Sequence, residues 1–327
     1  MAEGQDFMPA TDLQKCSWFI DVAGSCNLKC ISCPRGNWPR QPRAGFMKVE
    51  TFSRTLDKIL AEDPFIGAIN LYAWGEPLMH PRLAEIIRLS NAKGLQVSIS
   101  SNLSLKVDFE DVIKARPTYF RVSASGWDEN YEVTHAGGRW DLFLENLRRL
   151  AEWWPAHHPD MIVEMNYHIY RDRGEDYNRM RALCQELGIV FRAGHGRLHP
   201  LDNIRLIQDK LEVSREARQT VALQSLPIED GLEMLSRVED SPCPFKVMME
   251  LTWDNQARHC LAWFDPDIPP LAENFLDQPL DEILSRRRAS DFCRFCQARY
   301  LHRWCNVYGE EALTDETTPE VKAAHSA

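Results

Sequence analysis

The chain has 327 residues, of which 44% are hydrophobic and 26% are charged, a composition typical of a globular protein with a sizeable core. Its 38 basic and 48 acidic side chains give a formal net charge of −10, which argues against nucleic acid or an anionic membrane as a partner. The sequence shows no secretory signal and no apolar stretch of about 18 residues, so we expect a cytoplasmic protein without a membrane span.

Six strand-like apolar runs alternate with helical patterns over the first 200 residues. The runs cover residues 18–24, 68–73, 95–100, 119–125, 161–170 and 188–194. Apolar residues at helical spacing predict helices over residues 49–63, 81–94, 111–116, 140–154 and 177–188. Six βα units in series predict a parallel sheet with helices outside it, either an open doubly wound sheet or an incomplete barrel. In both arrangements, functional groups gather beyond the carboxyl ends of the strands.

The composition and pattern of the sequence change after residue 200. Residues 201–240 are polar, rich in helical patterns and without cysteine, and we expect them to connect two domains. A short strand-like run, a turn, a helical pattern at 280–287 and five cysteines predict a second domain over residues 241–310. Residues 311–327 are polar, and we expect them to be disordered.

The ten cysteines are grouped. Three lie within residues 26–33 and five between residues 243 and 305, while Cys16 and Cys184 stand alone. Cys184 lies within a predicted helix, so we expect it in the core. In a reducing compartment this grouping favours metal binding over disulfides.

The first group follows the end of the first predicted strand. Cys26, Cys30 and Cys33 have no fourth Cys or His nearby, since the next histidine is His80. A structural zinc site would need four ligands, whereas thiolates also hold iron–sulfur clusters. Three thiolates on a [4Fe–4S] cluster leave one iron open, where a small molecule can bind and receive an electron.

At these residues the sequence resembles a known family. CNLKCISCP, residues 26–34, is similar to the signature of the radical S-adenosylmethionine (SAM) enzymes, although Ser32 stands where many members carry an aromatic residue. The resemblance implies that the open iron binds the amino and carboxylate groups of SAM. One electron then cleaves SAM to a 5′-deoxyadenosyl radical, which takes a hydrogen atom from the substrate.

A segment after the second predicted strand strengthens the resemblance. Gly75, Glu76 and Pro77 match the end of the family's Gly-Gly-Glu-Pro segment, and Trp74 replaces its first glycine. The resemblance implies that this segment holds the amino group of SAM.

Two further segments also follow predicted strands. Ser101 and Asn102 stand in the places of the family's Thr-Asn-Gly segment near the SAM ribose. Ser123 and Gly126 match the Ser-x-Asp-Gly segment after the fourth strand, where Ser125 replaces the aspartate. These three segments lie at strand ends in the expected order, which favours an iron–sulfur cluster over a structural zinc site at the first cysteine group.

Composition alone would make the second cysteine group a four-Cys zinc site. However, the late spacing resembles the SPASM or shorter twitch extension of radical SAM enzymes, which implies one auxiliary [4Fe–4S] cluster. The ligands implied are Cys243, Cys260, Cys293 and Cys296. Cys305 is left over as a hydrogen-atom donor, a replacement ligand or an ordinary buried thiol.

Polar residues on the last two predicted strands of the first domain are further candidates. Glu164, Asn166 and His168 alternate, so they should face one side of the strand. Glu164 and Asn166 would contact SAM or substrate, or form an internal hydrogen-bond network with His168. Arg192 would contact the SAM carboxylate or an anionic substrate, or lie at the surface.

The sequence therefore predicts a radical SAM enzyme: an α/β protein with an incomplete (β/α)6 TIM-like barrel and a small C-terminal iron–sulfur domain. The late cysteine spacing resembles that of aminocyclitol dehydrogenases, so we expect oxidation or epimerisation of a small sugar or aminocyclitol. An electron donor such as flavodoxin or ferredoxin is implied. The alternatives are modification of a ribosomally made peptide and, from another class, a non-catalytic iron–sulfur or zinc scaffold or electron carrier.

Overall fold

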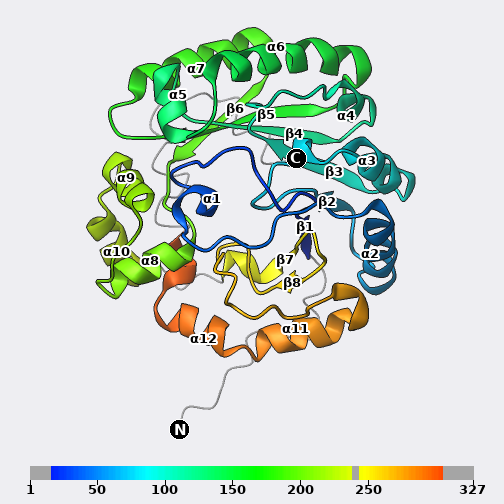
Figure 1. Ribbon diagram of the computed structural model, residues 1–327, viewed down its shortest axis with the longest axis vertical. Coiled ribbons are helices and arrows are strands. Elements are labelled where there is room, and N and C mark those ends of the chain that lie inside the picture. Colours follow the sequence, from blue (N-terminus) through cyan, green and yellow to red (C-terminus); the bar gives the residue numbers. More distant parts are fainter. Residues whose placement is uncertain (1–15, 238–242, 305–327) are drawn as a thin grey trace.

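A computed structural model of the chain describes residues 16–237 and 243–304. Its strands form an eight-stranded sheet in the order β6-β5-β4-β3-β2-β1-β7-β8 (Figure 1). The strands are β1 Ser17–Ile20, β2 Ala68–Asn70, β3 Gln96–Ser101, β4 Tyr119–Ala124, β5 Ile162–Ile169, β6 Val190–His195, β7 Met248–Leu251 and β8 Ala257–Arg258. The predictions for Cys305 and for residues 311–327 lie outside the described residues.

The helices lie around the outside of the sheet, except the short α1, which lies near the middle of the view (Figure 1). They are α1 Pro34–Asn37, α2 Val49–Glu62, α3 Leu83–Ala92, α4 Glu110–Lys114, α5 Glu129–Thr134, α6 Trp140–His157, α7 Gly174–Leu187, α8 Leu201–Gln208, α9 Arg215–Leu223, α10 Ile228–Arg237, α11 Leu280–Arg288 and α12 Asp291–Ala298. The pairings from β6 through β1 to β7 are parallel, and β7 with β8 is antiparallel. The sheet does not close, which confirms the predicted incomplete barrel.

The apolar periodicity explains why these elements form. In α2 the buried residues Val49, Phe52, Leu56 and Ile59 recur at helical spacing and face the sheet core. Helix α7 ends where Gly188 adopts a φ of 70°, a left-handed conformation that glycine reaches without steric cost. The alternation of buried and polar residues along the strands leaves one face of each strand free for the site.

The C-terminal part is joined to the barrel through β7. This strand pairs with β1 along its whole length and so extends the sheet of the first six strands. A second, smaller hydrophobic core connects residues 198–235 with residues 262–304, and Trp263 and Trp304 are buried within it. The predicted division into residues 1–200, 201–240 and 241–310 stays a prediction.

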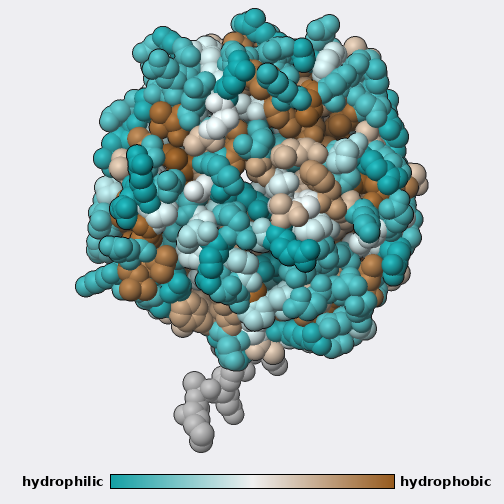
Figure 2. Space-filling view, in the orientation of Figure 1, coloured by the Kyte–Doolittle hydropathy of each residue, from teal (hydrophilic) through white to brown (hydrophobic). Residues whose placement is uncertain are grey.

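The surface is mainly hydrophilic on the face shown in Figure 2, with smaller hydrophobic patches. In the part of the chain that the structure describes, no helix is both long enough and apolar enough to cross a membrane. The predicted cytoplasmic location stays a prediction.

Candidate active site and second cysteine pocket

A pocket of about 1140 Å³ lies at the carboxyl ends of β2 to β5, where the loop after β1 crosses them. It brings together most of the residues that the sequence singled out. Those that line it are Cys26, Cys30, Cys33, Gly75, Glu76, Ser101, Asn102, Ser123 and Asn166. Functional groups of a parallel sheet are expected at this edge, because the chain leaves each strand there into a loop.

The cysteine loop is held by backbone hydrogen bonds on both sides. The Lys29 amide donates to the carbonyl of Ala136 at 2.8 Å, and the Asn27 side chain donates to the carbonyl of Ser104 at 2.8 Å. The third cysteine, Cys33, caps α1, whose first residue Pro34 has a fixed φ suited to a helix start. The loop therefore presents its three thiols from a supported backbone.

Burial sets the protonation of these thiols. It raises the pKa of Cys26 to about 12 and the pKa of Cys30 well above its ordinary value, and the neighbouring thiols raise the pKa of Cys30 further. A metal must therefore displace protons to bind here. In residues 16–237 and 243–304, no three Cys, His, Asp or Glu side chains surround a point closely enough for a single ion. Three thiols lining one pocket fit a multinuclear cluster, which spaces its ligands more widely.

Glu76 ties the loop after β2 to the loop after β3. Its carboxylate is buried and accepts hydrogen bonds from the Leu78 amide at 3.0 Å and from the Asn102 amide and side-chain nitrogen at 2.8 and 2.7 Å. The Asn102 side chain also lies 3.7 Å from the Cys26 sulfur. Burial raises the pKa of Glu76 to about 7. Glu76 and Asn102 thus link the two loops to the first cysteine.

Gly75 is required by close approach of two backbones. A Cβ at this position would lie 1.5 Å from the carbonyl oxygen of Ala23, in the loop that leads to the cysteines. The Gly75 amide donates to Asp21 Oδ1 at 3.2 Å, and the Glu76 amide donates to the Ser25 carbonyl at 2.9 Å. Pro77 is buried and opens a short 3₁₀ turn behind the pocket.

The wall formed by β4 and β5 is polar. His168 lies 3.3 Å from the Asn166 side chain and 3.5 Å from the Ser125 hydroxyl, so these groups share hydrogen bonds at the pocket surface. Burial lowers the pKa of His168 to about 4, with a further effect of two nearby arginines. The imidazole is therefore neutral at pH 7 and offers both a donor and an acceptor.

Glu164 and Arg192 are placed differently from Asn166. Glu164 is buried, and its Oε2 lies 2.5 Å from Nε of Arg192, whose side chain is half exposed. Neither is among the described residues that line the pocket. The sequence did not predict this pair, since it joined Glu164 to Asn166 and His168 and left Arg192 separate, and the roles of both residues in cofactor binding stay predictions.

Sequence reasoning missed several residues that line this pocket, among them Arg121, Tyr72, His135 and His199. Arg121 alternates with Ser123 on β4, so strand periodicity contained a signal for it. Tyr72 precedes the Gly75 segment by only three residues. His135 and His199 come from loops, and no local pattern marks them.

Comparison with known proteins identifies the fold and the family of the first domain. Residues 20–180 match the family model described as the radical SAM superfamily. The chain carries a radical SAM domain. Its cofactors are therefore a [4Fe–4S] cluster and SAM, and the three thiols of the first pocket fit that cluster.

Two curated relatives of the radical SAM enzyme match over part of its length. A tungsten-containing aldehyde ferredoxin oxidoreductase cofactor-modifying protein from Pyrococcus furiosus is 29% identical over 90 residues, which are 28% of this chain and 24% of that protein. A SAM-dependent nucleotide dehydratase from a Thermoplasmatales archaeon is 28% identical over 153 residues, 46% of this chain and 52% of that protein. The chain thus spans about a quarter and about half of these relatives.

A solved structure shows the same fold over more of the chain. The structure of Streptococcus suis SuiB bound to SAM superimposes with a TM-score of 0.57 at 14% identity, covering 88% of this chain and 72% of that one. SuiB has also been solved with its precursor peptide SuiA bound.

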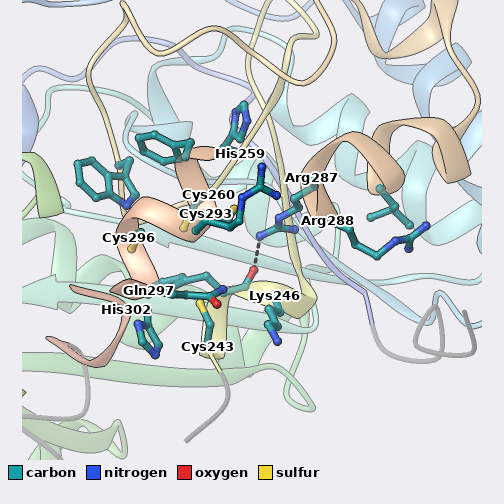
Figure 3. Close-up of a pocket in the computed structure, with 15 residues that line it drawn as sticks. Cys243, Lys246, His259, Cys260, Arg287, Arg288, Cys293, Cys296, Gln297 and His302 are labelled. Atoms are coloured by element: carbon teal, nitrogen blue, oxygen red, sulfur yellow. Dashed lines mark hydrogen bonds between the residues drawn. The ribbon is translucent and has the colours of Figure 1, made fainter. Parts of the chain in front are cut away.

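The four remaining predicted ligands line a second pocket of about 770 Å³ (Figure 3). Cys243 precedes β7, Cys260 follows β8, and Cys293 and Cys296 lie one turn apart on α12. Residues separated by three on a helix share one face, so the two helical thiols are directed to the same side.

A buried arginine accompanies these thiols. Arg287 of α11 donates to the carbonyl of Met248 at 2.6 Å and to the carbonyl of Phe245 (Figure 3). Burial raises the pKa of Cys260 well above its ordinary value, and the Arg287 charge opposes this rise. Cys243 and Cys293 experience the same two effects. The pocket therefore combines four thiols with a cation suited to an anionic thiolate cluster.

Proposed function

We propose that this radical SAM enzyme oxidises or epimerises a small polar molecule of the sugar or aminocyclitol type at a carbinol carbon. When bound, the cluster and SAM supply a 5′-deoxyadenosyl radical that removes a hydrogen atom from substrate. The second cysteine group is proposed to hold an auxiliary [4Fe–4S] cluster, which as an electron acceptor suits oxidation of an alcohol to a ketone.

The observation that carries the proposal is the chemistry of the pocket wall. Ser123, Asn166 and His168 offer hydroxyl, amide and neutral imidazole groups at the ends of β4 and β5. Burial also lowers the pKa of His135 and the pKa of His199 to about 3, so these imidazoles are neutral at pH 7. These neutral groups both donate and accept and so match the hydroxyls of a polyol, while Arg121 adds one cation to the same pocket.

The names of the similar proteins point to two kinds of substrate. The nucleotide dehydratase acts, by its name, on a nucleotide, whereas SuiB binds a precursor peptide. A peptide substrate is therefore the alternative that the experiment must separate. A flavodoxin or ferredoxin is proposed as the electron donor.

The test uses anaerobically reconstituted enzyme with dithionite and SAM. We expect formation of 5′-deoxyadenosine, abolished in Cys30→Ala and retained in Cys184→Ala, whose thiol lies in the hydrophobic core. A sugar or aminocyclitol deuterated at its carbinol carbons should transfer deuterium into 5′-deoxyadenosine. Transfer only from a peptide would favour the alternative, and product formation by Cys30→Ala would refute the ligand assignment.

A further inference from the structure

A third pocket adjoins the SAM pocket and is assigned to neither cysteine group. It measures about 770 Å³, and Asp21, Arg35, Glu250 and Arg258 contribute charged groups to its lining. Trp74 lines both this pocket and the SAM pocket, so one side chain forms the wall between them. Trp74 is also the residue that replaces the first glycine of the family segment. We call the third pocket the Glu250 pocket.

Strand register directs Glu250 into this pocket. In β7, Met249 and Leu251 belong to the hydrophobic core, as do Trp18 and Ile20 of β1. Because side chains alternate along a strand, Glu250 faces the opposite side, the inside of the barrel. The residue after β1, Asp21, donates its amide to the Leu251 carbonyl at 2.8 Å and lines the same pocket.

Glu250 carries a buried carboxyl group with an open hydrogen-bonding site. The residue is 4% exposed, and its Oε2 has no hydrogen-bond partner within the described ranges. Its cross-strand neighbour Arg258 instead donates to the carbonyls of Ile268 at 3.3 Å and Asp265 at 3.0 Å. Burial raises the pKa of Glu250 to about 8. An unpaired buried oxygen of this kind costs stability, and an arriving donor would remove that cost.

The Asp21 carboxylate, by contrast, already has hydrogen-bond and charge partners. Its carboxylate accepts from the Gly75 amide at 3.2 Å and lies 4.0 Å from the Arg35 guanidinium. Asp21 therefore supports the loop after β2, and the third acid, Asp254, accepts from the Thr252 hydroxyl at 2.6 Å, whereas Glu250 retains a buried oxygen with capacity for a ligand.

Aromatic side chains cover the remaining walls. Trp253 donates its indole nitrogen to the Arg43 carbonyl at 3.0 Å, which holds its ring in place. The Trp74 indole nitrogen is buried and, like Glu250 Oε2, has no partner among the residues that the structure describes. Together with Phe264, these rings offer apolar faces beside one open donor and one open acceptor.

We propose that the Glu250 pocket is a second part of the substrate site, in which Glu250 accepts a hydrogen bond from a hydroxyl or ammonium group of a small cyclic polyol or amino polyol. The Trp74 indole donates to a hydroxyl oxygen of the same molecule, and the rings cover its apolar face. This inference rests on the proposed function, since the reacting carbon must extend past Trp74 into the SAM pocket.

The probes are myo-inositol and its diamino counterpart streptamine, titrated calorimetrically into reconstituted enzyme with SAM and without reductant. Glu250→Gln should weaken binding of at least one probe by about 3- to 10-fold, the usual effect of losing one hydrogen bond. Glu282→Gln makes the same side-chain replacement on the exposed face of α11 and should leave binding unchanged. SAM affinity and the unfolding midpoint serve as checks of folding.

Equal binding by wild type and Glu250→Gln, or no binding of either probe to wild type, would overturn the inference. An ordered water on Glu250 that persists when a probe is bound would also overturn it. Trp74→Phe provides an independent variant and should weaken binding by about 3- to 10-fold. Probe binding needs no SAM cleavage, so a failure of the binding test refutes only the proposal for the Glu250 pocket. Absence of 5′-deoxyadenosine with wild-type enzyme would instead refute the proposed function.

Discussion

Replacement of Gly75 by alanine should displace the loop that organises the active site. The new Cβ would lie 1.5 Å from the Ala23 carbonyl oxygen and 2.9 Å from Asp21 Oδ1. An ordinary contact needs about 3.5 Å, so the loop after β2 must retreat by roughly 2 Å from the segment leading to Cys26. Overpacking of this kind costs about 1–3 kcal/mol in the free energy of unfolding. A misplacement of about 1 Å can cost about 100-fold in function.

The assay compares Gly75→Ala with Gly67→Ala. A Cβ at Gly67, between α2 and β2, meets no atom within 4 Å, so this variant should match or slightly exceed wild-type stability. We expect Gly75→Ala to lower the unfolding midpoint and to weaken SAM binding to reconstituted enzyme by about 100-fold. Wild-type SAM affinity in Gly75→Ala would refute the reasoning, because it would mean that a Cβ fits between the backbones of residues 75 and 23.

Three further predictions concern the charged groups and the second cysteine pocket. Cys243→Ser should reduce the iron content from about eight to about four atoms per chain while 5′-deoxyadenosine still forms. An unchanged iron content would refute the assignment of an auxiliary cluster to this pocket. Arg287→Met should lower the reduction potential of that cluster in redox titrations, and Arg287→Lys should largely restore it; equal potentials in all three proteins would contradict the role of the charge. Because burial raises the pKa of Glu250 from 4.5 to about 8, the folded protein retains a proton that the unfolded chain releases. The stability that this retained proton contributes is complete below about pH 4.5 and is lost as the pH rises towards 8. Glu250→Gln, which does not titrate, should therefore gain stability relative to wild type by up to about 1.4 kcal/mol per pH unit across this range, measured by denaturant titration.

Much of the barrel could be predicted because its signals are local. The apolar runs predicted β1 to β6 to within a few residues, and Phe52, Leu56 and Ile59 marked α2 by their spacing. Other features depended on contacts across the fold. Glu164 faces Arg192 outside the lining of the SAM pocket, a distinction that alternation along β5 cannot make, because residues on one face still differ in depth.

Loop residues were the hardest to predict. His135 and His199 reach the SAM pocket from segments without periodicity, and nothing in their neighbours indicates a direction. Glu250 had a weak signal, since a single charge interrupts the apolar run 247–253. Such a charge is equally compatible with an exposed strand face, so sequence alone could not assign it to a pocket.

The sequence by itself determined the cysteine loop, because Cys26, Cys30 and Cys33 lie on one short segment and reach one pocket wherever that segment is placed. Only the tertiary structure decided that Glu250 lies beside Asp21, 229 positions earlier in the chain. That neighbourhood follows from the pairing of β7 with β1, which is set by burial of Met249 and Leu251 against a distant core. Hydrophobic packing is non-directional and selects partners only once the whole sheet is assembled.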